Sequence, residues 1–92
     1  MALIDKVRSA CNYRTTARDD DLQDLILAAI ADLRKMGIDA AEDTANPRTA
    51  QAIILFCRAY GQTDDPNADR FMQMYEGLKA SLALQEGDPY VV

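Results

Sequence analysis

The residues that could carry chemistry in this 92-residue chain are its carboxylates and its two cysteines. Three consecutive aspartates, Asp19, Asp20 and Asp21, could attract a cation. The segment has neither the alternating ligands nor the glycine of a calcium-binding loop. Acidic residues in a row suit the first turn of a helix, where the helix dipole favours negative charge. We therefore expect a helix start here and no metal site.

The residue types most used in catalysis are scarce. The chain contains no histidine, the commonest general base and metal ligand. Cys11 and Cys57 lie far apart on apolar helical faces, which favours buried free thiols; a disulfide between helices is the alternative. Four isolated glycines form no phosphate-binding loop, and two cysteines without histidine form no usual zinc site. We expect a protein that is not an enzyme and uses no cofactor.

Hydrophobic spacing predicts four helices and no strand. The expected helices cover residues 2–12, 20–36 and 47–61, and a fourth opens at Asp65 and Pro66. The chain is short enough for one domain. We predict an all-α fold in which residues 1–84 pack as a bundle, followed by a flexible, extended C-terminal tail at 85–92. The helix cannot continue past Pro89.

Residues at the expected helix ends support these boundaries. Thr15, Thr16 and Asp19 are candidate N-caps of the second helix, and Gly37 is suited to the left-handed position after its end. Asn46 before Pro47 starts the third helix. Two further residues carry specific expectations. Ile38 anchors the connecting loop on the bundle, and Gly77 allows a close backbone contact in the last helix.

The helix predicted over 47–61 is more apolar than a small domain can easily cover. One side, which we predict to face the core, consists of Ala50, Ile53, Ile54, Cys57 and Tyr60. The opposite side consists of Ala52, Leu55, Phe56 and Ala59. A helix that is apolar nearly all round is buried on more than one side. Either the helix is simply central, or Leu55 and Phe56 contact another chain. We expect a central helix whose far face is partly covered by a neighbouring subunit.

Charge is unevenly distributed along a chain of net charge −5. Residues 1–18 carry +3, from Lys6, Arg8, Arg14 and Arg18 against Asp5. Residues 19–46 carry −6, from Arg34 and Lys35 against Asp19, Asp20, Asp21, Asp24, Asp32, Asp39, Glu42 and Asp43. Such a distribution suits self-association between differently charged edges. The candidates for a subunit interface are therefore Leu55, Phe56, Lys6, Arg8, Arg14, Arg18, Asp20, Asp21 and Asp24. The candidates for partner binding by the tail are Pro89, Tyr90, Val91 and Val92.

Composition also disfavours membranes and nucleic acids as partners. No apolar run approaches the roughly 20 residues that span a bilayer, and Asp5, Lys6 and Arg8 interrupt any signal-peptide core. A helix-turn-helix would need a basic recognition helix, but the third helix offers only Arg48 and Arg58. We expect no sequence-specific nucleic-acid binding.

Three segments in order carry a resemblance to a known family. They are MALIDKVRSACNYR, the acidic DDDLQDLILAAIADLRKMG and, after a variable loop, NPRTAQAIILFCRAYG. With the amphipathic last helix, they resemble the small head–tail connector (adaptor) proteins of tailed bacteriophages over about residues 1–84. The positions that correspond are Asp20, Leu22, Leu25, Ile26, Ala28 and Ala29, then Pro47, Ala52, Ile53, Leu55 and Tyr60.

The resemblance implies a non-enzymatic structural protein of the virion, located at the head–tail junction and in the host cytoplasm during assembly. About a dozen copies would form a ring beneath the portal, continue the DNA channel and join head to tail. The implied partners are further copies of the chain, the portal protein, and a head-completion (stopper) or tail protein.

Two other functions fit the residues. One is a small helical adaptor or regulatory protein that binds a single protein partner through the third helix or the tail. The other is a nucleic-acid binder that uses Lys6, Arg8, Arg14 and Arg18, whose affinity would depend strongly on salt.

Overall fold

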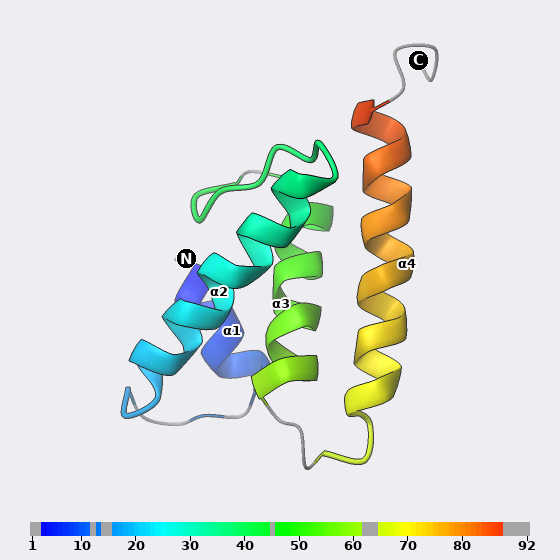
Figure 1. Ribbon diagram of the computed structural model, residues 1–92. Helices are drawn as coiled ribbons and strands as arrows, with labels where there is room; N and C mark the ends of the chain where they lie inside the picture. The colour runs from blue at the N-terminus through cyan, green and yellow to red at the C-terminus, as the bar shows by residue number, and fades with distance from the viewer. Residues whose placement is uncertain (1–2, 12, 14–15, 45, 62–64, 88–92) are drawn as a thin grey trace.

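The computed structural model describes residues 3–11, 13, 16–44, 46–61 and 65–87, with side chains as far as Leu84. It contains four helices, α1 (Leu3–Ala10), α2 (Asp19–Lys35), α3 (Pro47–Gly61) and α4 (Ala68–Gly87), and the described residues contain no strand (Figure 1). The predicted all-α bundle is confirmed. Helix α4 continues three residues past the expected boundary at 84, and the tail residues 88–92 lie outside the described part.

The end of α2 follows from Gly37. This residue has φ of 80°, a left-handed conformation that glycine adopts without steric cost. The amide of Gly37 then donates to the carbonyl of Arg34 (3.0 Å), and that of Ile38 to the carbonyl of Leu33 (3.2 Å). These two bonds form a Schellman motif, in which Ile38 and Leu33 bury their side chains together. The predicted roles of Gly37 and Ile38 are both confirmed.

The starts of the helices agree less closely with the prediction. Asn46 caps α3 as expected, because its Oδ1 accepts a hydrogen bond from the amide of Arg48 (2.9 Å). Helix α2 instead has Arg18 at its N-cap, without a side-chain cap bond. The proposal of Asp19 as N-cap is wrong, because its carboxylate is bound to Arg8.

Helix α4 also begins later than predicted, at Ala68 rather than Pro66. Asp65 uses its Oδ1 to accept from the amide of Asn67 (2.8 Å), and its carbonyl accepts from the amide of Ala68 (3.0 Å). Residues 66 and 67 therefore form a turn that leads into the helix.

Helix α3 is the centre of the bundle (Figure 1). It packs against α4 on one side and against α2 and α1 on the others. The chain reverses direction between α2 and α3 and again between α3 and α4, so α2 and α4 both run upward in Figure 1, with α2 inclined across the bundle. This arrangement explains the apolar composition of α3, since nearly every side of the helix has a neighbour.

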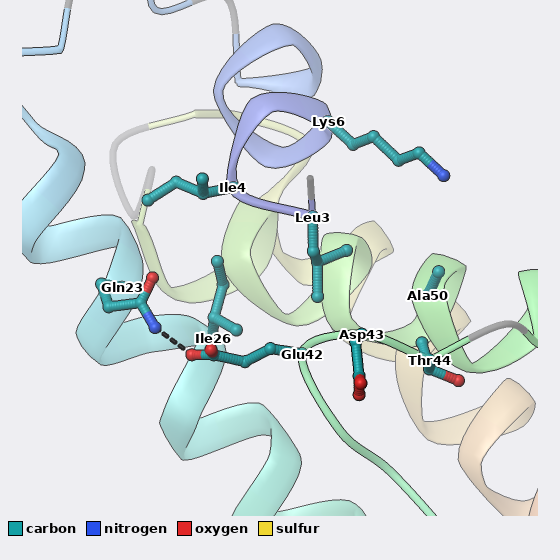
Figure 2. A pocket seen from close by; sticks show the side chains of 9 residues that line it. All are labelled: Leu3, Ile4, Lys6, Gln23, Ile26, Glu42, Asp43, Thr44 and Ala50. Carbon is teal, nitrogen blue, oxygen red and sulfur yellow. Dashed lines mark hydrogen bonds between the residues drawn. The ribbon is translucent and has the colours of Figure 1, made fainter. Parts of the chain in front are cut away.

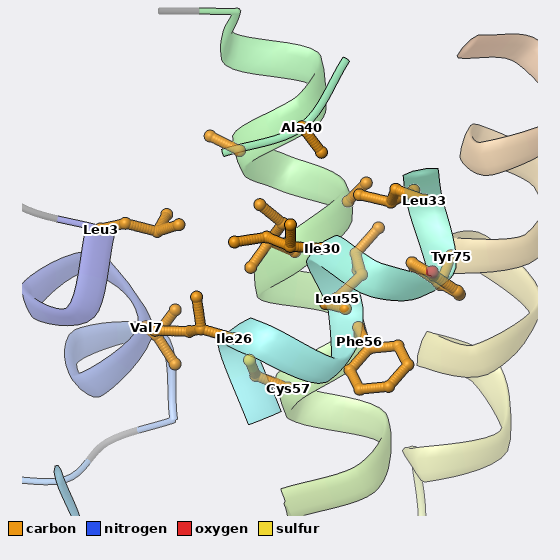
Figure 3. Close-up of a cluster of buried hydrophobic side chains, with 14 of the residues drawn as sticks. Leu3, Val7, Ile26, Ile30, Leu33, Ala40, Leu55, Phe56, Cys57 and Tyr75 are labelled. Atoms are coloured by element: carbon orange, nitrogen blue, oxygen red, sulfur yellow. The ribbon is translucent and has the colours of Figure 1, made fainter. Parts of the chain in front are cut away.

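The burial of side chains within the single chain differs from the helical-wheel prediction for α3 (Figure 3). Ile53 and Cys57 lie in the core as predicted, but Tyr60 is 50% exposed and Ile54 is only partly buried. The supposed far side is core as well: Leu55 is 4% and Phe56 9% exposed, because α4 covers it. The cover includes Tyr75 of α4, whose ring meets the Phe56 ring edge to face with 5.2 Å between the ring centroids. The expectation that these two side chains await another subunit is therefore wrong.

Gly77 faces open space in the described part of the chain. Apart from its own turn of helix, nothing lies within 4 Å of the point where a Cβ would stand. The close contact that we predicted here does not occur within the subunit. Replacing Gly77 with alanine should raise the free energy of unfolding by about 1 kcal/mol, because alanine loses less backbone entropy in a helix.

Urea denaturation of Gly77→Ala measures this gain. Gly37→Ala is the matched control and should lower stability, because its positive φ is strained for any residue with a Cβ. Equal effects of the two substitutions would contradict the assignment of Gly77 as an unstrained, open helical position.

Candidate functional site

Arg8 joins the basic start of the chain to the acidic segment that follows it. Its Nε and Nη2 donate to the two carboxylate oxygens of Asp19 at 2.9 and 2.6 Å, and its Nη1 donates to Asp5 at 2.8 Å. These bonds raise the pKa of Arg8 and hold the pKa of Asp19 below its usual range. A bidentate pair of this kind fixes α1 on the first turn of α2. Part of the charge complementarity that we expected between subunits is thus used within one chain.

The other predicted interface residues differ in their availability. Arg18 pairs with Asp21 at 3.3 Å on the surface. Lys6, Asp20 and Asp24 are exposed. Arg14 and the tail candidates Pro89, Tyr90, Val91 and Val92 lie outside the described residues. The interface role of these residues stays a prediction, and Lys6, Asp20 and Asp24 are the charges best placed to meet a partner.

The Asp19 contact predicts acid-sensitive docking of α1. Because the pKa of Asp19 is lowered, its pair with Arg8 is complete above the ordinary carboxyl pKa and is lost as pH falls through the lower folded value. Asp19→Asn should therefore speed hydrogen exchange of the α1 amides at neutral pH, with little further change on acidification. Asp20→Asn, on the exposed side, is the control. Equal exchange in the two variants would show that Arg8 does not hold α1.

A network of polar side chains joins α2 to α4. Asp32 accepts hydrogen bonds from the Tyr75 hydroxyl (2.5 Å) and from Lys79 Nζ (3.0 Å), and Lys79 also pairs with Glu76. The Tyr75 bond is the main cause that lowers the pKa of Asp32, while burial and the same bond raise the pKa of Tyr75. Sequence reasoning missed this network because Asp32 and Tyr75 are 43 residues apart. We assign it a structural role, namely holding α4 against α2.

A pocket of about 390 Å³ opens between α1, α2 and the loop after α2 (Figure 2). Its apolar lining is Leu3, Ile4, Ile26 and Ala50, and its polar lining is Lys6, Gln23, Glu42, Asp43 and Thr44. Gln23 donates a hydrogen bond to Glu42 across one side. The loop is held in this position because the side chains of two of its own residues, Ile38 and Ala40, are buried in the core. Of these anchors the sequence had indicated only Ile38.

The candidate nucleophiles and metal ligands are placed where they cannot react easily. Both cysteines are free and buried, as predicted, and burial raises the pKa of the Cys57 thiol to about 12. Burial also raises the pKa of Cys11. In the described ranges, no group of three or more cysteine, aspartate or glutamate side chains is arranged to hold a metal ion. None of the helices described combines the length and apolar character needed to cross a bilayer.

Comparison with known families gives one match. The family model described as "Phage connector protein" matches residues 3–89, almost the whole chain. The chain belongs to the phage connector protein family. Neither the curated proteins nor the solved structures include one that matches it.

Membership of the connector family gives the chain a structural role. Connector proteins are components of the virion and associate with other virion components, and the family is not typically enzymatic. The family match therefore confirms the resemblance recognised in the sequence, with coverage that extends into the tail at 89.

Proposed function

We propose that this connector protein forms a ring of about a dozen copies beneath the portal, where it continues the DNA channel and joins the head to a stopper or tail protein. The match of the family model over residues 3–89 is the observation that carries the proposal. The protein would act in the host cytoplasm during assembly and remain at the head–tail junction of the virion.

The charge of the chain supports this role. A surface with net charge −5 does not retain passing DNA through phosphate contacts, which a channel component must avoid. Arg8, one of the four basic residues that a nucleic-acid binder would use, is already bound to two carboxylates. This pairing makes the hypothesis of a nucleic-acid binder less favourable.

The burial of α3 disfavours the other alternative. An adaptor that bound one partner through Leu55 and Phe56 of α3 would need these side chains at the surface. Both are instead covered by the chain itself, and Tyr60 is the large hydrophobic side chain of α3 that is exposed. The tail would be the remaining binding segment for such an adaptor.

Deletion of the gene from its phage tests the proposed role. We expect lysates of the deletion phage to contain DNA-filled heads and separate tails in electron micrographs, with tailed particles restored by a plasmid copy of the gene. Infectious tailed particles formed without the gene would overturn the proposal.

A further inference from the structure

The pocket between α1, α2 and the loop after α2 is suited to hold a large side chain. Leu3 and Ile26, which are buried, point into it from α1 and α2, and Ala50 lines it from the start of α3 (Figure 2). Its volume of about 390 Å³ lies within the range of about 300–1,000 Å³ that ligand pockets span. The pocket therefore combines room for an aromatic side chain with an apolar lining.

The edge of the pocket offers two kinds of polar contact. Lys6 on α1 is exposed and forms no ion pair with another residue of the described ranges. Glu42 and Asp43 on the loop are exposed carboxylates. A carboxylate accepts a hydrogen bond from a phenol, as Asp32 does from Tyr75 within this bundle. An occupant with an apolar body, a hydroxyl group and a negative charge would satisfy both the lining and the edge.

The segment that follows α4, residues 88–92, has this composition. Asp88 supplies a negative charge, Tyr90 supplies an apolar ring with a hydroxyl, and two valines follow. Pro89 fixes one backbone dihedral directly before Tyr90, which lowers the entropy lost on binding. This segment therefore matches the pocket in charge, polarity and size.

The pocket of the same chain is out of reach for Tyr90. Arg48, in the first turn of α3, donates from Nη2 to Ser81 Oγ at 2.8 Å, so α4 passes the start of α3 near Ser81. Six further residues carry α4 about 9 Å beyond this point to Gly87. Helix α3, about 10 Å in diameter, stands between α4 and the pocket (Figure 1). The three residues from Gly87 to Tyr90 span at most about 10 Å, which is shorter than the path back and across.

A neighbouring copy can bring the two surfaces together. In Figure 1, α4 lies on one side of α3 and α1 with α2 on the other, and α4 ends at the end of the bundle that carries the loop after α2. The segment after α4 thus leaves on one side of the subunit, and the pocket opens on the other side. A ring interface joins two different surfaces of consecutive subunits in this way.

We propose that residues 88–92 of one copy bind in the pocket of the next copy in the ring, with Tyr90 on the apolar lining and Asp88 beside Lys6. This inference rests on the proposed ring. It makes each contact between subunits depend on a segment that leaves one bundle and enters another.

Two substitutions test the two halves of this contact in assemblies of the full chain with portal rings of its phage. Tyr90→Ala removes the anchor, and Ala50→Phe fills the pocket from α3. Each should reduce the amount of chain that sediments with the portal by about tenfold, because buried aromatic anchors carry much of the binding energy of an interface. Leu84→Ala, which removes an exposed apolar side chain from the end of α4, is the control and should sediment like the wild type. Circular dichroism checks that each variant remains helical.

Mixed single-cysteine variants give a readout that does not depend on affinity. Chains with Asp43→Cys and chains with Val91→Cys, assembled together and oxidised, should give a disulfide-linked dimer on a non-reducing gel that neither variant gives alone. The native Cys11 and Cys57 are buried and do not compete. Leu27→Cys mixed with Val91→Cys is the control and should give no such dimer, because Leu27 is exposed on α2 but does not line the pocket.

The outcomes separate this inference from the ring itself. If the wild-type chain assembles on the portal, but Tyr90→Ala and Ala50→Phe assemble equally well and no mixed dimer forms, the proposed contact is wrong and the ring stands. A loss of assembly with Tyr90→Ala alone, without a mixed dimer, would mean that the segment binds another protein, and would also overturn the inference. A wild-type chain that never sediments with the portal contradicts the proposed function, and the inference falls with it.

Discussion

Replacing Leu55 with aspartate will unfold the isolated chain. Leu55 is 4% exposed and belongs to the same buried cluster as Phe56 and Tyr75. Removing a buried leucine side chain alone costs about 2–5 kcal/mol, and an unpaired carboxylate adds the cost of its desolvation. A domain of this size has only about 5–10 kcal/mol of stability to lose. Circular dichroism at 222 nm should show loss of helix at neutral pH.

Tyr60→Asp is the matched control on the same helix. Tyr60 was predicted to lie in the core but is 50% exposed, so its replacement should leave the chain folded. The opposite result is equally informative. A folded Leu55→Asp variant that only fails to assemble would restore the original interpretation, in which this side of α3 is kept for a neighbouring subunit.

Replacing Asp32 with alanine will loosen α4. The carboxylate accepts bonds from Tyr75 and Lys79; its removal would leave Tyr75 without this partner and Lys79 with only its pair with Glu76. Hydrogen bonds to a charged group contribute about 1.5–3 kcal/mol each when buried. The Asp32 side chain is 35% exposed, so solvent screening reduces the expected loss to about 1–2 kcal/mol in total. Urea denaturation at pH 7 measures the loss.

The same variant should change the acid response of the chain. The pKa of Asp32 is lowered by its bond from Tyr75, so its contribution is complete above the unfolded carboxyl pKa of about 3.9. That contribution disappears as pH falls through the lower folded value. The difference in stability between wild type and Asp32→Ala should therefore shrink below about pH 4. Asp24→Ala, on the exposed side of α2, should show neither effect; identical behaviour of the two variants would contradict the role of Asp32.

Local signals in the sequence were enough to predict the helices. Gly37 and Asn46 determine helix ends through hydrogen bonds that span two to five residues, so they can be recognised without the rest of the fold. Asp19 shows the limit of such reasoning. It resembles an N-cap, but a partner 11 residues earlier in the chain takes its carboxylate.

The surroundings of α3 could not be predicted in the same way. A helical wheel gives the direction of Leu55 and Tyr60 from the helix axis, but not which directions other helices occupy. The structure places α4 over Leu55 and Phe56 and leaves Tyr60 half exposed, so the core extends to the side expected to face a neighbour and excludes one residue expected within it. The Asp32 network and the pocket likewise depend on contacts between segments that are distant in sequence.

The direct test of the connector role is electron microscopy of portal rings from the same phage, mixed with an excess of the purified full chain. We predict an additional ring of density, with about a dozen subunits, on one end of each portal. Portal rings that remain bare at saturating concentrations of the folded chain would contradict the proposed function.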